Sequence, residues 1–206
     1  MIRAVLFDLD GVLVETPDLH YMALNRALRD VAGFEIEHAD HIVRFNGLPT
    51  ATKLAMLVSE GKLREDDVER VWDMKQVRTI DVISEMIKQD EQKIRLVAGL
   101  ARRGYMQACV TNSITQTALL MLIRCGVLGY MDIVVTNQMI ERPKPDPECY
   151  LLAMKRLGLR PDEALIVEDA PKGIAAAEAS GGRVLRVAGV NDVTLECILG
   201  ELVKET

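Results

Sequence analysis

The sequence predicts an α/β fold, a doubly wound parallel sheet with an inserted all-helical cap domain. Three observations lead to this prediction. Short and continuously apolar runs are typical of strands buried on both faces, as in a parallel sheet. Segments with helical periodicity separate the later runs, which is the alternation of a doubly wound sheet. One long stretch after the first run shows helical patterns alone, so we interpret it as an insertion.

The expected strands are short runs, most of them rich in β-branched residues: Ala4–Phe7, Met106–Val110, Ile133–Val135, Ala164–Val167 and Val184–Val187. The helices expected between the later runs are Thr115–Cys125, Pro147–Leu157 and Lys172–Ala179. Each is followed by a glycine that suits a helix C-cap, namely Gly126, Gly158 and Gly181. Strands and helices of these lengths predict a Rossmann-like core.

The stretch from about residue 17 to residue 89 contains no convincing strand. Apolar residues recur at helical spacing in Leu19–Val31, Thr50–Ser59 and Asp66–Ile87, and loops with Gly33, Asn46-Gly47 and Gly61 separate these helices. We therefore expect a core of residues 1–15 and 90–206 and a helical cap of residues 16–89. Hinges are expected near residues 14–17 and in the polar link at 88–93.

Composition limits the classes of function. The 206 residues carry a net charge of −6 and include three Phe, four Tyr and one Trp. An acidic chain with few aromatics is not expected to bind nucleic acid. No apolar run approaches the ~20 residues of a membrane helix, and the first run is too short for a signal peptide. The four cysteines lack the spacing of a zinc site, and we expect them to be reduced thiols in a cytoplasmic protein. We also expect the protein to be a monomer or a weak homodimer.

The strongest chemical signal is Asp8-Leu9-Asp10-Gly11, directly after the first expected strand. Ligands of open parallel sheets gather at the carboxyl ends of strands. Side chains two apart on an extended segment share a face, so Asp8 and Asp10 can address one pocket. Because two close carboxylates repel, the pair favours a bound cation or a raised pKa on one member. Taken alone, the pattern also fits an Asp-rich surface turn.

Three further polar segments follow expected strands or the loops between them. Thr111-Asn112-Ser113 offers hydroxyls and N–H groups just before a helix, which suits an anion site, although such residues are also common N-caps. Lys144 lies in a loop that three prolines stiffen, where the alternative is a solvated charge. Glu168-Asp169 follows the run Ala164–Val167 and is ambiguous by itself.

In this order the segments resemble the motifs of the haloacid dehalogenase-like hydrolase superfamily. Asp8-x-Asp10 resembles its first motif, and Thr111 resembles the hydroxyl of its second. Lys144-Pro145 resembles the third motif, and Glu168-Asp169 the fourth.

The segment from Asp10 to Thr16, with His20, resembles the β-phosphoglucomutase and phosphoglycolate phosphatase branch, which carries a helical cap after the first motif. Asp169-Ala170-Pro171-Lys172-Gly173 resembles that family's loop after the fourth motif. The resemblance therefore spans nearly the whole chain.

The resemblance implies a Mg²⁺-dependent phosphatase. Asp8 is expected to attack the phosphorus and form an aspartyl-phosphate, and Asp10 to act as general acid and base. The residues implied for Mg²⁺ are Asp8, Asp10 through its backbone carbonyl, Asp169, and Glu168 through a water or from behind the ligands. The residues implied for the phosphoryl group are Thr111, the Asn112 N–H, Ser113 and Lys144.

The resemblance also places substrate recognition in the cap, in residues 45–53. Asn46 and Lys53 are candidate substrate contacts, and Thr16 and His20 are expected at the hinge or the pocket edge. The alternative for residues 45–53 is a plain loop with Thr50 as the N-cap of a helix. A lone His on a helix is more often merely packed or solvated.

Other functions of the same fold are weaker. β-Phosphoglucomutases carry basic residues where this chain has Asn46 and Thr50, so a phosphatase for a small phosphorylated metabolite, such as a sugar phosphate, is favoured over a mutase. The usual Pro-Gly before the core helix is also missing from residues 93–99. Dehalogenases use one carboxylate without Mg²⁺, whereas Asp10 and Asp169 are both present. A non-catalytic phosphometabolite-binding protein is the alternative from another class, but a binder needs no nucleophile with an acid/base partner.

Overall fold

The computed structural model describes residues 1–45 and 48–204, apart from the side chain of Pro17. The chain divides into two compact units. One consists of Met1–Thr16 with Ile87–Thr206, and the other of Pro17–Met86. Among the described helices, none has the length and apolar character that a membrane crossing requires.

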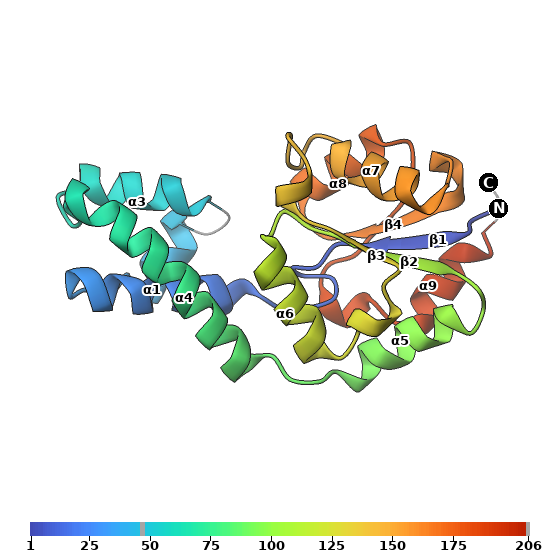
Figure 1. Ribbon diagram of the computed structural model, residues 1–206, viewed down its shortest axis with the longest axis horizontal. Coiled ribbons are helices and arrows are strands. Elements are labelled where there is room, and N and C mark those ends of the chain that lie inside the picture. The colour runs from blue at the N-terminus through green and yellow to red at the C-terminus, as the bar shows by residue number, and fades with distance from the viewer. Residues whose placement is uncertain (46–47, 205–206) are drawn as a thin grey trace. The chain divides into compact units, whose positions relative to one another are not determined.

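The first unit contains a sheet of parallel strands in the order β3-β2-β1-β4-β5 (Figure 1). The strands are β1 (Ala4–Phe7), β2 (Met106–Val110), β3 (Ile133–Val135), β4 (Ala164–Glu168) and β5 (Arg183–Arg186). All residues of β1 and β4 are buried, as expected for central strands covered on both faces. Phe7 pairs with Cys109 and with Val167, so β1, β2 and β4 end nearly level. The segments that follow these strands therefore start at one edge of the sheet.

Helices cover both faces of this sheet. Figure 1 shows α7 (Glu148–Leu157) and α8 (Pro171–Ala179) on one face. On the other face lie α5 (Glu91–Ala101), α6 (Thr115–Cys125) and α9 (Leu195–Leu202). The predicted α/β fold with a doubly wound parallel sheet is confirmed.

Most of the predicted boundaries hold to within a residue. β1, β2, β3 and α6 have the predicted ranges, whereas β4 extends to Glu168 and β5 lies one residue earlier than expected. Gly126 and Gly158 cap α6 and α7 with φ of 86° and 66°, as the left-handed C-cap requires. Helix α8 ends at Ala179 as predicted, but Ser180 is its C-cap, and Gly181 follows with a φ of 79°. Pro147 is the N-cap of α7 rather than its first residue.

The polar link expected at residues 88–93 is in part helical. The Asp90 carboxylate accepts hydrogen bonds from the N–H groups of Gln92 (2.9 Å) and Lys93 (3.0 Å), so α5 begins at Glu91. Lys93 is buried, and its Nζ donates to the carbonyl oxygens of Val190 (2.5 Å) and Val193 (2.9 Å). The segment that was expected as a polar link therefore includes a buried lysine of the first unit.

In the described part of the second unit, every regular element is a helix or a helical turn. Its elements are α1 (Pro17–Ala32), α2 (His38–Asp40), a π-helical turn (His41–Phe45), α3 (Thr50–Ser59), a 3₁₀ turn (Glu65–Asp67) and α4 (Val68–Met86). Its core includes Leu24, Leu28, Phe45, Leu57 and Val71, all buried. Helices α1 and α4 pack along each other and share the two-pronged ion pair of Arg26 with Glu85 (2.9 and 2.7 Å).

Two predictions for this unit need correction. Thr50 is not an N-cap: Pro49 holds that position without a side-chain hydrogen bond, and Thr50 is the first residue of α3. The helix expected over Asp66–Ile87 begins as a 3₁₀ turn and ends at Met86, while Ile87 belongs to the first unit.

Candidate active site

A buried lysine lies at the centre of the polar groups that follow the strands. Lys144 Nζ donates to Asp8 Oδ1 at 2.6 Å, to Glu168 Oε1 at 2.6 Å and to the carbonyl oxygen of Val110 at 2.8 Å. An ammonium group has three N–H bonds, so these acceptors use all of them. The lysine is 6% exposed. The predicted alternative of a solvated charge is therefore wrong for Lys144.

The loop that carries Lys144 is fixed by Asn112. The Lys144 N–H donates to Asn112 Oδ1 at 3.1 Å, and Asn112 Nδ2 donates to the Lys144 carbonyl at 3.4 Å. This pair of bonds holds the end of β2 and the proline-rich loop together. The side chain of Asn112 is thus engaged with the loop, and its N–H is the group that the resemblance implies for an anion.

Glu168 has a second donor that sequence reasoning missed. The Tyr150 hydroxyl donates to Glu168 Oε1 at 2.5 Å, and the Asp169 N–H donates to Oε2 at 3.2 Å. The Tyr150 ring also lies 4.8 Å from Lys144 Nζ, within the range of a cation–π contact. In the sequence, Tyr150 is one more aromatic residue on the apolar face of a predicted helix. That pattern predicts core packing and gives no signal for the hydroxyl.

Burial dominates the electrostatics of this cluster. Burial raises the pKa of Asp8 to about 7, Lys144 opposes the rise, and the carboxylates of Glu168 and Asp10 add to it. Burial alone would lower the pKa of Lys144, but Asp8 and Glu168 outweigh it and hold that pKa above its ordinary value. Lys144 is therefore the permanent cation of the site, and Asp8 is the group whose charge depends on its surroundings.

Asp10 and the Thr111–Ser113 segment also meet. Ser113 Oγ donates to Asp10 Oδ2 at 3.0 Å, and the Ser113 N–H donates to Thr111 Oγ1 at 3.0 Å. Thr111 is fully buried. The structure thus brings the first and second predicted motifs together. Ser113, which was expected to bind an anion, donates a hydrogen bond to Asp10.

The carboxylates fit a divalent metal ion. Oxygens of Asp8, Glu168 and Asp169 lie within 4.8 Å of one another. Glu168 Oε1 already accepts two hydrogen bonds, whereas Asp169 Oδ1 is buried and has no hydrogen-bond partner among the described residues. A Cβ atom at Gly11 would lie 2.1 Å from Asp169 Oδ2, so only glycine leaves room for that carboxylate. Hard carboxylate oxygens are the ligands that Mg²⁺ prefers.

The remaining candidate residues lie elsewhere in the chain. Thr16 is the last residue of the first unit's opening segment and is buried, whereas His20 and Lys53 belong to the helical unit. Lys53 is 6% exposed, burial lowers its pKa, and no carboxylate of the described chain forms an ion pair with it. Asn46 lies outside the described residues.

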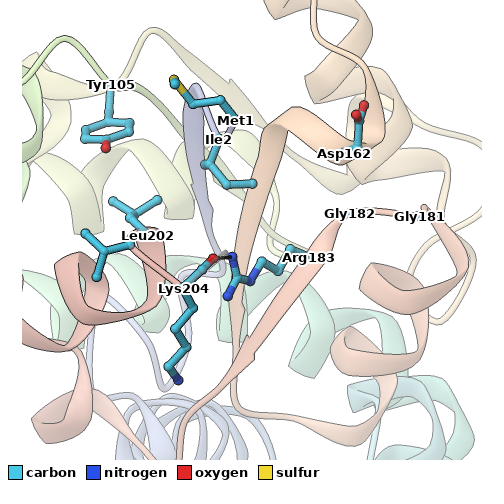
Figure 2. Close-up of a pocket in the computed structure, with 10 residues that line it drawn as sticks. Met1, Ile2, Tyr105, Asp162, Gly181, Gly182, Arg183, Leu202 and Lys204 are labelled. Atoms are coloured by element: carbon cyan, nitrogen blue, oxygen red, sulfur yellow. Dashed lines mark hydrogen bonds between the residues drawn. The ribbon is translucent and has the colours of Figure 1, made fainter. Parts of the chain in front are cut away.

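A pocket of about 910 Å³ lies at the opposite edge of the same sheet (Figure 2). It is lined by residues that precede the strands, including Ile2, Tyr105 and Gly182. Its guanidinium group, that of Arg183, bonds the Lys204 carbonyl at 2.8 Å and Glu201 at 3.1 Å. These polar groups are satisfied within the protein, so the carboxyl edge of the sheet remains the candidate site.

Comparisons with known proteins agree with the geometry. Residues 5–187 match the model of a family described as haloacid dehalogenase-like hydrolase. The phosphorylated carbohydrates phosphatase of Thermotoga maritima is 29% identical over 191 residues, covering 91% of this chain and 85% of that protein. Hexitol phosphatase A of Escherichia coli is 30% identical over 186 residues, covering 90% and 82%.

Solved structures show the same fold. CbbY of Rhodobacter sphaeroides in complex with phosphate superposes with a TM-score of 0.77 at 24% identity, covering 92% of this chain and 87% of that one. β-Phosphoglucomutase of Clostridium difficile superposes with a TM-score of 0.74 at 23% identity, covering 98% and 97%. At these identities the likeness concerns the fold alone.

Proposed function

This chain belongs to the haloacid dehalogenase-like hydrolase family, and we propose that it hydrolyses a small phosphorylated metabolite through an aspartyl-phosphate, with Mg²⁺ as cofactor. Its family and the names of its relatives, which are phosphatases, support a phosphoric monoester hydrolase. The substrate class, the metal and the intermediate are the parts that we propose.

One observation carries the proposal: the Lys144 ammonium lies 2.6 Å from the Asp8 carboxylate in a buried site. An anionic nucleophile and an anionic phosphate repel, and a fixed cation beside both lowers that repulsion as charge develops in the transition state. The ammonium that would offset this charge is in direct contact with the proposed nucleophile.

We assign the covalent steps to Asp8 and Asp10. A carboxylate oxygen of Asp8 forms a bond to phosphorus while the bond from phosphorus to the ester oxygen breaks, and protonated Asp10 gives its proton to the leaving alcohol. Asp10 then takes a proton from water as the water oxygen attacks the phosphorus, which releases phosphate and restores Asp8. Ser113, which donates to Asp10 Oδ2, keeps that carboxyl oriented between the two steps.

We propose that Asp8, Asp169 and the backbone carbonyl of Asp10 hold the Mg²⁺. The ion supplies positive charge that neutralises the phosphoryl oxygens and the nucleophile. We propose that Glu168 binds the ion through a water or orients the groups around it, because its Oε1 oxygen already accepts hydrogen bonds from Lys144 and Tyr150. Thr111, the Asn112 N–H, Ser113 and Lys144 are the proposed contacts of the phosphoryl group.

We further propose that Thr16, His20, Asn46 and Lys53 contact the rest of the substrate. The physical argument is strongest for Lys53, because its side chain is largely buried, burial lowers its pKa, and a ligand with negative charge would supply the acidic partner that it does not have in the described chain. A sugar phosphate, with hydroxyls and a second polar end, suits such a group.

The test is phosphate release from p-nitrophenyl phosphate with Mg²⁺ or with EDTA. We expect activity only with Mg²⁺, and a loss of about 1000-fold or more in kcat for Asp8→Asn, because the amide is not a nucleophile. Asp162→Asn, at an exposed position beyond the other edge of the sheet, is the matched control and should retain wild-type activity. Full activity of Asp8→Asn would contradict the assignment of the nucleophile.

A further inference from the structure

Glu168 is buried, with only 1% of its surface exposed, and hydrogen-bond donors surround its carboxylate. Its Oε1 atom accepts from Lys144 Nζ at 2.6 Å and from the Tyr150 hydroxyl at 2.5 Å, while Oε2 accepts from the Asp169 N–H. The oxygen that contacts the lysine therefore has two donors, one charged and one neutral.

Tyr150 is held tightly in the first turn of α7. It has no exposed surface, and its N–H donates to the Pro147 carbonyl at 3.0 Å. Its ring packs in the core of the first unit with Cys149, Ala153 and Ile166. Phenylalanine would provide this packing and the cation–π contact equally well, so packing does not account for the hydroxyl.

The lysine is shared between two carboxylates. Asp8 Oδ1 and Glu168 Oε1 both lie 2.6 Å from Lys144 Nζ, and in a buried site each attracts the ammonium strongly. A neutral donor on Glu168 Oε1 satisfies part of its negative charge and weakens its hold on the lysine. The Tyr150 hydroxyl is that donor.

We propose that Tyr150 is a positioning residue of the phosphatase, whose hydroxyl, acting through Glu168, keeps the Lys144 ammonium on the nucleophile Asp8. Without the hydroxyl, Glu168 would draw the ammonium toward itself and away from Asp8. This inference rests on the proposed function, because it takes Asp8 as the nucleophile. Tyr150 touches neither the substrate nor the reacting atoms in this arrangement.

The first test is Tyr150→Phe, which removes the hydroxyl and keeps the ring. With p-nitrophenyl phosphate and saturating Mg²⁺ we expect kcat to fall about 10-fold, the size typical for outer partners of active-site groups, with KM within about 2-fold of the wild type. The lysine acts on charge that develops in the transition state, so its displacement affects kcat rather than substrate binding. Tyr130→Phe, at a residue 36% exposed, is the matched control and should leave both constants unchanged.

The second test repeats the substitution in a Glu168→Gln background. If the hydroxyl acts through the carboxylate, Tyr150→Phe should change kcat by less than about 2-fold there, because a neutral amide does not compete for the ammonium. A purely structural role would give the same loss in both backgrounds. If Tyr150→Phe fails to fold, Tyr150→Met removes the same hydroxyl and carries both measurements.

An unchanged kcat in the folded Tyr150→Phe protein would overturn the proposal, as would an equal loss in the two backgrounds. Failure of the proposed function would give a different result, because the wild-type protein itself would then show no phosphate release that depends on Asp8.

Discussion

The excess of negative charge at the carboxyl edge of the sheet helps to explain the raised pKa values of Asp8 and Asp169. With every carboxyl group ionised, Asp8, Asp10, Glu168 and Asp169 bring four negative charges against the one positive charge of Lys144. Burial makes such an excess costly, which is why the pKa of Asp8 rises to about 7 and that of Asp169 also rises. A proton or a divalent cation relieves the same excess, so the two should compete.

That competition predicts a pH-dependent affinity for Mg²⁺. Below a pH of about 7 the Asp8 carboxyl holds a proton that the metal must displace, so we expect Kd for Mg²⁺ to rise up to about 10-fold per pH unit as the pH falls. Above pH 7 the carboxylate is already ionised, and Kd should be nearly constant. Calorimetric titration at pH 5.5, 6.5, 7.5 and 8.5 measures this directly.

Two variants frame the measurement. Asp169→Asn should lose most of the affinity at every pH, whereas the exposed Asp162→Asn should follow the wild-type curve. An affinity that stays constant between pH 5.5 and 7.5 would show that Asp8 is not a ligand or does not hold the proton.

Sequence patterns identified most residues of this cluster but not their partners. Asp8, Thr111 and Glu168 were predictable because polar residues at the ends of parallel strands meet at one edge. The hydroxyl of Tyr150 was not, because its acceptor is fixed by the packing of α7 against the sheet. No local periodicity encodes that distance.

At the scale of elements, the strands were predictable because a short, continuously apolar run is typical of a strand covered on both faces. The helix α5 was harder. Its first turn consists of charged and amide residues, which locally favour a solvated link as much as a helix. The deciding interactions are the Asp90 cap and the burial of Lys93, and the second depends on carbonyl groups about 100 residues later in the chain.

Lys93 should therefore matter for stability and not for chemistry. Its ammonium satisfies the carbonyl oxygens of Val190 and Val193, which tie the loop before α9 to α5. Lys93→Met would leave both carbonyls without this donor, and we expect the free energy of unfolding to fall by about 2–4 kcal/mol. Urea denaturation followed by circular dichroism checks the value, with the exposed Lys88→Met as control.

The activity of the same variant separates the two roles. Folded Lys93→Met protein should keep the wild-type kcat at low temperature, since the lysine contacts backbone carbonyls and no group of the candidate active site. A loss of kcat without a loss of stability would contradict this assignment.

At the scale of the whole molecule, the two compact units contribute different things. The first unit contains the parallel sheet with the carboxylates and their lysine, and Lys144 there is paired with both Asp8 and Glu168. Within the described residues, the helical unit buries Lys53 without an acidic partner and His41 with no hydrogen-bond partner for Nδ1. The division of the chain was predictable from the long stretch without strand patterns. This difference in charge pairing was not, because burial of a single lysine depends on how the helices pack.

A buried charge without an acidic partner in the described chain predicts that stability and function oppose each other at Lys53. Lys53→Met keeps an unbranched apolar side chain and removes the partly desolvated ammonium, so we expect the free energy of unfolding to rise by about 0.5–1 kcal/mol and Tm to rise with it. The same change should raise KM for a sugar phosphate substrate about 10-fold or more if the ammonium contacts the substrate. Lys62→Met, at an exposed position of the same unit, should alter neither quantity. A lower Tm in Lys53→Met would contradict this prediction. It would show that Lys53 stabilises the helical unit through packing, rather than being retained for contact with the substrate.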